Sequence, residues 1–221
     1  MLDRAKIRCP MPTIRPYQPR DLDALYAISL ATGNSGGDAA PLYDDPRLIG
    51  HVYSGPYALL APELVHVVED GDGVAGYVLG TYDTRAWAER LEREWWPHLR
   101  ERHADPLDVP ADRRTPDQRR AAMIHRPEMP PAEVVARFPA HIHINLLPRL
   151  HRRGLGTALL DKWLAAAHDN GVPRVHIGAN RGNENAVRFW ASRGFREIEL
   201  PGAPEGRTVW MGLDVTTGAG G

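Results

Sequence analysis

Cysteine, lysine and long apolar runs are all scarce in this sequence. Cys9 is the single cysteine, which excludes an internal disulfide and is typical of proteins of a reducing compartment. No uninterrupted run of about 18 or more apolar residues is present, the length that a membrane-spanning helix needs. The opening Met-Leu-Asp-Arg-Ala-Lys also lacks the apolar centre of a signal peptide. We therefore expect a cytoplasmic protein with no membrane partner.

An excess of charge of either sign is absent as well. The 27 basic residues, of which only Lys6 and Lys162 are lysines, almost balance the 28 acidic ones, and the formal net charge is −1. No global positive field attracts nucleic acid, so we expect no nucleic-acid partner. With 221 residues, 43% of them hydrophobic, the chain can bury one substantial core. We expect a single domain over residues 13–215, between a flexible arm at 1–12 and a flexible tail at 216–221.

A basic glycine turn is the most informative feature that the sequence does contain. Residues 141–164 read as an apolar strand, the turn His-Arg-Arg-Gly-Leu-Gly at 151–156 and the first part of a helix. Glycines let the backbone approach a ligand closely, and the first N–H groups of a helix have no partner within it. Together with the arginines, among them Arg149, these groups form a cradle for an anion such as a pyrophosphate.

Other kinds of glycine turn compete with this interpretation. A dinucleotide-binding turn would require a further glycine at position 159, where the chain has Leu159. A phosphate-loop nucleotidase would require Gly-Lys followed by Ser or Thr, which the sequence lacks. A strand-to-helix turn that binds no ligand stays open on this segment alone.

A second motif follows the turn after a further expected strand at 174–179. Asn183 begins a short helix that ends at Gly194 and Phe195, in the pattern Asn-x-x-Ala-x-x-Phe-Trp-x-x-x-Gly-Phe. The two motifs, in this order and at this spacing, resemble those of the GNAT family of acyl-CoA-dependent N-acetyltransferases. The resemblance extends over roughly residues 13–214.

The amino-terminal half resembles a narrower group within that family. Its segments at 14–16, 31–33, 48–50, 53–57 and 76–81 are similar to the carboxy-terminal acetyltransferase-like domain of eukaryotic protein O-GlcNAcase. In that domain the phosphate turn is degraded, whereas the turn of this chain is intact. The resemblance therefore implies a free-standing bacterial relative that binds the cofactor.

The resemblance implies an α/β fold with one mixed sheet, helices on both of its faces, and acetyl-CoA as the cofactor. It also implies that the backbone at 145–147 pairs with the pantetheine arm, and that a strand amide polarises the thioester carbonyl. The cofactor-binding residues expected from the turn and the resemblance are Leu146, Leu147, His151, Arg152, Arg153, Gly154, Leu155, Gly156, Thr157, Asn183, Asn185 and Trp190.

Hydrophobic periodicity and turn residues predict the remaining elements. The expected strands are 13–15, 64–69, 74–82, one beginning at His141, 174–179, 195–200 and 207–215. The expected helices are 19–30, 45–52, 116–124, 131–138, 154–170 and one beginning at Asn183.

A helical insertion is expected at about 84–139, between the third and fourth strands, where the family usually has a short turn. Trp87, Leu91, Trp95 and Leu99 recur every four residues there and share one helical stripe. Packing against the sheet, an acceptor-pocket wall and a dimer surface are all compatible with this stripe.

Three polar residues alternate along the strand before the turn. His141, His143 and Asn145 therefore point to one face of the sheet. An unperturbed histidine titrates near neutrality, so His143 is our candidate for the base that takes a proton from the acceptor amine, and Asn145 is a further candidate catalytic residue. Histidines that are merely polar residues of that face remain an alternative. We expect no metal site, because no third ligand lies near the two histidines.

Two carboxylates and one aromatic residue complete the candidates for the chemistry. Asp38, in a glycine-rich loop, and Asp83, after the third strand, could hold a cationic acceptor or act as base, or could simply cap turns. Trp190 stands where the family often has the tyrosine that protonates the departing thiolate, and His151 where Gln or Arg is usual. An indole N–H is not a proton-transfer acid, so the thiolate would leave through water.

These features favour an acetyl-CoA-dependent N-acetyltransferase that acts directly on a small-molecule or peptide amine. A non-catalytic acetyl-CoA-binding or regulatory module is the alternative, and a third interpretation makes the insertion a dimerisation element on an inactive fold. Both a monomer and a homodimer are compatible with the sequence.

Overall fold

The computed structural model describes residues 11–200 and 206–215, so the expected tail and nearly all of the expected arm lie outside the described residues. The described strands form one sheet in the order β1-β2-β3-β4-β5-β7-β6, in which β4 and β5 run parallel and every other neighbouring pair is antiparallel. The strands are β1 (Thr13–Pro16), β2 (His66–Asp70), β3 (Gly73–Thr81), β4 (Ala140–Leu146), β5 (Arg174–Asn180), β6 (Arg196–Glu197) and β7 (Thr208–Asp214).

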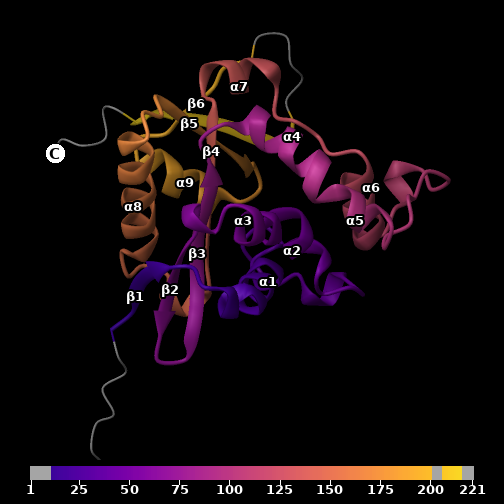
Figure 1. The fold of residues 1–221 in the computed structure, drawn as a ribbon, viewed down its shortest axis with the longest axis horizontal. Helices are drawn as coiled ribbons and strands as arrows, with labels where there is room; N and C mark the ends of the chain where they lie inside the picture. The colour runs from indigo at the N-terminus through magenta and orange to yellow at the C-terminus, as the bar shows by residue number, and fades with distance from the viewer. Residues whose placement is uncertain (1–10, 201–205, 216–221) are drawn as a thin grey trace, which may run out of the picture.

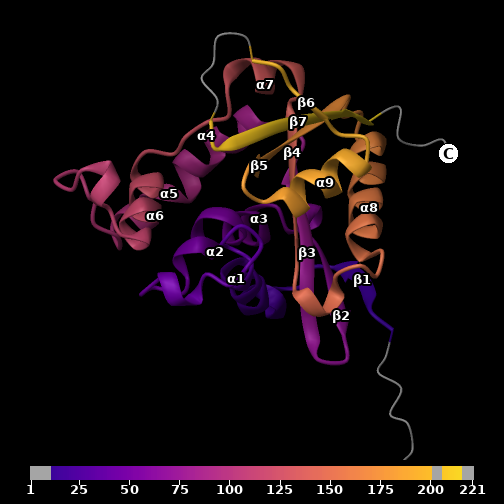
Figure 2. The same ribbon diagram turned by 180° about the vertical axis from the view of Figure 1, so that it is seen from behind.

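Helices cover both faces of this sheet (Figures 1 and 2). α8 packs on β3 and β4 and α9 on β5, whereas α1 and α3 contact β3 from the opposite face. The helices are α1 (Leu22–Ala31), α2 (Leu48–Tyr53), α3 (Gly55–Leu60), α4 (Thr84–Glu94), α5 (Trp96–Arg100), α6 (Pro116–His125), α7 (Ala132–Arg137), α8 (Leu155–Asp169) and α9 (Glu184–Ser192). The predicted mixed α/β class is confirmed.

The side chains of β4 alternate between two hydrophobic cores. Ile142 and Ile144 join the core under α8, which also holds the buried Trp163. His141 and His143 point to the other face, where the ring of Tyr57 lies 5.9 Å from each of theirs. The strand period of two therefore places the histidines and Asn145 on one face, as predicted.

The segment between β3 and β4 forms α4 to α7; α4, α5 and α6 extend from the sheet as an arm in Figure 1, whereas α7 lies against β5. The predicted stripe is interrupted, because α4 ends before Trp95 and α5 begins with Pro97 in its first turn. Trp87, Leu91 and Leu99 nevertheless all lie in the core beside α1 and α3. Their main role is therefore packing.

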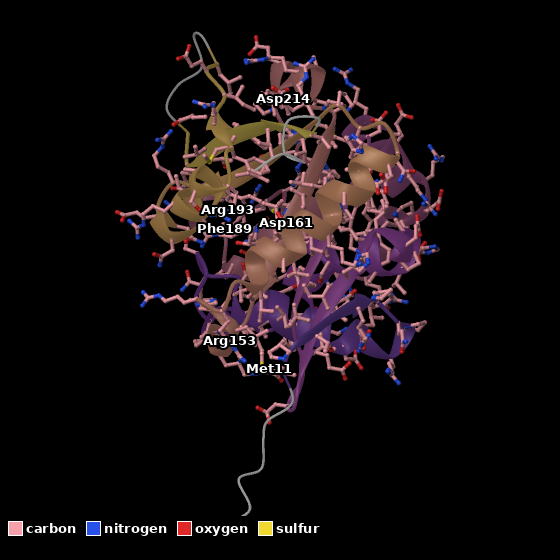
Figure 3. All side chains as sticks on the ribbon, turned by 90° about the vertical axis from the view of Figure 1, so that its left-hand side faces the viewer. Met11, Arg153, Asp161, Phe189, Arg193 and Asp214 are labelled. Carbon is pink, nitrogen blue, oxygen red and sulfur yellow. The ribbon has the colours of Figure 1, made fainter. Side chains whose placement is uncertain are left out.

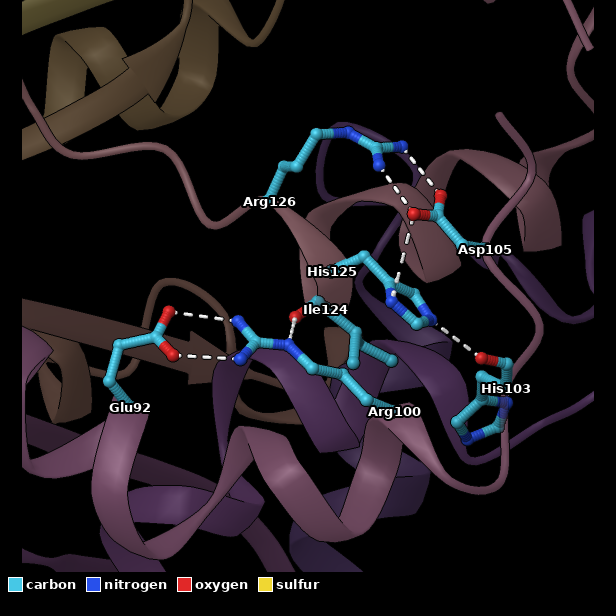
Figure 4. Close-up of polar contacts among 7 residues, drawn as sticks. All are labelled: Glu92, Arg100, His103, Asp105, Ile124, His125 and Arg126. Carbon is cyan, nitrogen blue, oxygen red and sulfur yellow. Dashed lines mark hydrogen bonds and ion pairs between the residues drawn. The ribbon is translucent and has the colours of Figure 1, made fainter. Parts of the chain in front are cut away.

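Ion pairs hold the outer part of this arm together (Figure 4). Arg100 binds Glu92 through two hydrogen bonds of 2.8 Å and donates a third to the carbonyl of Ile124. Arg126 makes a similar two-bond pair with Asp105, at 2.6 and 2.7 Å. These contacts join α4, α5 and α6.

Two elements differ from the prediction. No element was expected where α3 lies; proline suits the first turn of this helix, where its missing N–H costs no bond. The expected strand at 195–200 is reduced to Arg196–Glu197.

Candidate active site

β4 and β5 separate soon after they begin to pair. Their register is limited to Ala140 with Val175 and His141 with His176, whereas β4 pairs with β3 from His141 to Leu146. Leu147 extends this second ladder, because its N–H donates to the carbonyl of Ala75 at 2.8 Å. The carboxyl-terminal half of β4 therefore has one free edge among the described residues.

The antiparallel ladder determines which amides lie on that edge. Hydrogen-bonded pairs alternate along it, so the N–H groups of His143, Asn145 and Leu147 face β3, and those of Ile144 and Leu146 face the gap. This corrects the expectation that the backbone of Asn145 and Leu147 is available to a ligand. Only Leu146, of the three residues expected, presents its amide to the gap.

A cavity of about 720 Å³ occupies this gap and continues to the glycine turn. Its wall combines the end of β4, the turn, the first residues of α8 and α9, and the loop after α1. The lining residues are Thr32, Ser35, Gly36, Gly37, Ile144, Asn145, Leu146, Leu150, His151, Arg152, Gly154, Leu155, Gly156, Thr157, Asn183, Asn185, Ala186, Phe189 and Trp190. Most of the predicted cofactor-binding residues thus meet in one place.

The glycine turn has the backbone that an anion cradle needs. Gly154 has φ +75°, a left-handed conformation that favours glycine, and a Cβ there would meet no protein atom within 4 Å. The first helical bond of α8 runs from Ala158 N–H to the Gly154 carbonyl, so the N–H groups at 155–157 precede it. These amides and the open space beside Gly154 fit a diphosphate.

Cations beside the cradle differ in their availability. Figure 3 shows α8 with Arg153 at its amino-terminal end and Phe189 and Arg193 beside it. Arg193 donates to the Thr157 hydroxyl at 3.3 Å, a contact between segments 36 residues apart that no local sequence pattern predicts. Arg149, in contrast, is paired with Asp70 at 2.9 Å. Arg153 and Leu147 do not line the cavity.

His141 is held in one neutral form on the other face of β4. Thr84 donates its only hydroxyl proton to the carbonyl of Pro139 at 2.7 Å, so it must accept the proton of His141 Nδ1, 2.8 Å away. Nε2 of His141 is then an acceptor, and the Tyr57 hydroxyl donates to it. Burial holds the pKa of His141 well below its usual value.

His143 lies two residues further along the strand and does not line the cavity. Its ring packs against those of Tyr57 and His141, at centroid distances of 5.9 and 5.5 Å. Burial and, as a smaller cause, the nearby His176 together lower its pKa to about 4. His143 is therefore an uncharged and weak base at neutral pH.

The candidate carboxylates both act as local caps. Asp83 is the N-cap of α4 and accepts from the N–H groups of Arg85 and Ala86 at 2.9 and 3.0 Å. Asp38 accepts from the N–H of Ala40, two residues on, at 2.9 Å. Both are exposed and outside the lining of the cavity.

The second motif places its residues on the far wall of the cavity. Asn183 caps α9 by accepting from the N–H of Ala186 at 3.1 Å, and Asn185 accepts from Arg188 at 2.8 Å. Trp190 is buried between Phe189 and Phe195, with ring centroids 5.1 and 4.9 Å away. Its indole shapes the wall and offers no acid.

The described residues contain neither a membrane-spanning helix nor a cluster of metal ligands. No helix in this part of the chain is long and apolar enough to cross a membrane. No group of three or more His, Cys, Asp or Glu side chains within it is arranged to hold a metal ion.

The chain is similar to several known proteins. Protein O-GlcNAcase of Rattus norvegicus is 24% identical over 196 residues, which cover 87% of this chain but only 21% of that protein. The chain thus spans about a fifth of the length of this curated relative. The crystal structure of SsHAT is 38% identical with a TM-score of 0.83, covering 93% of this chain and 99% of that one. yncA of Salmonella typhimurium, solved with its cofactor acetyl-CoA, shares the fold, with a TM-score of 0.54 at 18% identity over 96% of this chain and 98% of its own.

A match to the Acetyltransferase (GNAT) family covers residues 15–195, from β1 to the end of the second motif. It includes the split strands, the glycine cradle and the start of α9. The chain belongs to the Acetyltransferase (GNAT) family.

Proposed function

We propose that this chain is an acetyl-CoA-dependent N-acetyltransferase that transfers the acetyl group directly to an amine. The observation that carries the proposal is the single cavity that joins the free edge of β4 to the glycine cradle. An extended arm that ends in a diphosphate needs both surfaces at once. The presence of acetyl-CoA in the crystals of the Salmonella relative supports this choice of cofactor.

Each part of the cavity would hold a different part of the cofactor. The N–H groups at 155–157, with Arg152 and Gly154, would bind the diphosphate. The backbone of Ile144 and Leu146 would pair with the pantetheine arm, and Asn183, Asn185 and Trp190 would contact it from the other wall. Acetyl-CoA, when bound, supplies a thioester whose C–S bond breaks as the new C–N bond forms.

The chain would then provide polarisation and proton transfer. An N–H of the β4 edge, at Ile144 or Leu146, stabilises negative charge on the carbonyl oxygen. Neutral His143, two residues from the lining residue Asn145 on the same face of β4, remains our candidate to accept the proton of the amine. Water would protonate the sulfur, because the indole N–H of Trp190 is not a proton-transfer acid.

A non-catalytic acetyl-CoA-binding module is the second candidate. The absence of an acid at Trp190 favours it. Turnover separates the two, because both predict cofactor binding and only the enzyme releases thiol when an amine is added.

A pair of glycines at the two ends of α8 tests the cradle. Gly154 and Gly171 have φ of +75° and +70°, and at both a Cβ would meet no protein atom within 4 Å. Gly154→Ala and Gly171→Ala should therefore cost similar stability, about 1–2 kcal/mol. Acetyl-CoA at a hundred times Kd should stabilise wild type and Gly171→Ala by about 2.7 kcal/mol in thermal melts, and Gly154→Ala far less. Equal stabilisation of the two variants would refute the cradle.

A further inference from the structure

The side-chain amide of Asn145 has one defined orientation. The Thr32 hydroxyl donates its single proton to the carbonyl of Ile28 at 2.7 Å. It must therefore accept from its other neighbour, which is Asn145 Nδ2 at 2.6 Å. Oδ1 of Asn145 is left as a hydrogen-bond acceptor without a partner among the described residues. Thr32 and Asn145 both line the cavity, on the face of β4 opposite the α8 core.

The described lining of the cavity contains no carboxylate. The charged side chain in it is Arg152, which is positive, and both candidate carboxylates are occupied as caps outside it. The titratable groups that face His143 are His141, Tyr57 and His176, and each is uncharged at neutral pH. Nothing in this surface compensates the positive charge of an ammonium group that loses its water.

The proton balance of the reaction points the same way. When an uncharged amine attacks, nitrogen forms the C–N bond and loses one proton, and the sulfur leaving from the C–S bond gains one. No net proton leaves the site. An ammonium acceptor must first release a further proton, and at neutral pH only about one in a thousand lysine side chains is uncharged. Only the small uncharged fraction then reacts unless a base in the site takes this proton, and His143, with a pKa of about 4, is a weak base.

We propose that Oδ1 of Asn145 accepts a hydrogen bond from the incoming amine, and that the site therefore selects amines that are uncharged at neutral pH, such as aromatic amines and hydrazides, over alkylammonium groups. Thr32 is the positioning residue that fixes the orientation of this amide. The inference rests on the acetyltransferase activity proposed above. A weak base such as His143 is matched to a weakly basic amine.

Acceptors of similar size test the selectivity. Aniline, benzhydrazide and benzylamine are compared at pH 7 with saturating acetyl-CoA, by thiol release. We expect kcat/KM for aniline and benzhydrazide to exceed that for benzylamine at least about tenfold, and only the benzylamine value to rise with pH towards 9. Benzylamine as the best acceptor at pH 7 would overturn the inference and leave the proposed function standing.

Variants of the hydrogen-bonded pair test the residues. Asn145→Ala should lower kcat for aniline about tenfold or more, since it removes one hydrogen bond in the reacting complex. Asn145→Asp should shift the aniline-to-benzylamine ratio at least about tenfold towards benzylamine. Thr32→Val should lower kcat while Thr32→Ser restores it. An unchanged ratio in Asn145→Asp would contradict the assignment.

Measurements of acetyl-CoA binding distinguish a failure of this inference from a failure of the proposed function. Stabilisation by acetyl-CoA should be the same in wild type and in all these variants, because Oδ1 lies on the face of β4 opposite α8, whose first turn forms the cradle. Loss of that stabilisation in every Asn145 and Thr32 variant would show a cofactor contact and overturn the inference. Absence of thiol release from wild type with all acceptors would refute the proposed function and the inference with it.

Discussion

Arg15 holds two carboxylates at the β1 edge of the sheet. Its guanidinium donates to Asp21 at 2.6 and 2.8 Å and to Glu69 at 2.5 Å. Asp21 is only 3% exposed, and the bond from Arg15 holds the pKa of this carboxyl below its usual value. A buried carboxylate that loses its partner is costly, so the contact is best tested by removing the arginine.

Arg15→Met should lower the free energy of unfolding by about 3 kcal/mol at pH 7, as urea denaturation can measure. Because the folded-state pKa of Asp21 is lowered, this contribution is complete above about pH 4 and is lost as the pH falls further. The exposed pair of Arg90 and Glu94 is the control, and Arg90→Met should cost less than about 1 kcal/mol. Similar losses in the two variants would contradict a buried role for Asp21.

At the scale of elements, α4 begins where a candidate carboxylate lies. Asp83 accepts two N–H bonds of the first turn, and Thr84 next to it fixes His141. The start of this helix thus positions His141, on the face of β4 that also carries Asn145, while the later turns of α4 supply core residues.

Asp83→Ala should lower stability by about 1 kcal/mol, and Asp83→Ser, which keeps a capping oxygen, should restore most of it. Thermal melts measure this effect. Because Asp83 lies outside the cavity, kcat should stay within about twofold in Asp83→Ser. A large loss of kcat in Asp83→Ser, with stability unchanged, would indicate that the carboxylate of Asp83 takes part in the reaction.

Elements with strong local signals were predicted from the sequence. The glycine turn, the hairpin of β2 and β3, and α8 all follow from short-range patterns, and they lie where predicted to within a few residues. The break between α4 and α5 at Trp95 and the start of α3 were not predicted. A proline lies close to each of them, and proline is compatible either with the first turn of a helix or with a loop.

The composition of the site depends on contacts between distant segments. Thr32 and Asn145 are 113 residues apart, and Tyr57 and His141 are 84 apart. No local pattern reveals such pairs, whereas the cradle residues are neighbours in the chain and could be identified together. For the same reason the alternation of residues along β4 correctly predicted the face on which each side chain lies. It could not predict the direction of the backbone N–H groups, because that direction depends on the pairing of β4 with β3.

On the scale of the whole molecule, buried histidines make stability depend on pH. Burial lowers the pKa values of His51 and His143 to about 4, and those of His66, His141 and His176 also lie below the usual value. The unfolded chain therefore binds more protons than the folded one below about pH 6.5.

The free energy of unfolding should consequently fall as the pH is lowered from about 6.5 to 4. Above that range, the titration of histidines should change it little. His51 lies away from the cavity, and its Nδ1 contacts the Tyr26 hydroxyl at 3.0 Å. The slope of the free energy of unfolding against pH gives the number of extra protons that the unfolded chain binds. His51→Gln should lower this number by up to about one, as denaturation at several pH values can show. A slope equal to that of wild type would contradict a buried, neutral His51.

The two register pairs between β4 and β5 are also the only ladder contacts that join a four-stranded half of the described sheet to a three-stranded half. The boundary between β4 and β5 is therefore where the sheet would separate most easily, and it is also where the pantetheine arm of the cofactor would lie. The pantetheine arm of a bound cofactor would contact both halves of the sheet. The protein without cofactor should therefore be the more flexible one, and cofactor binding should reduce mobility at positions far from the reacting atoms.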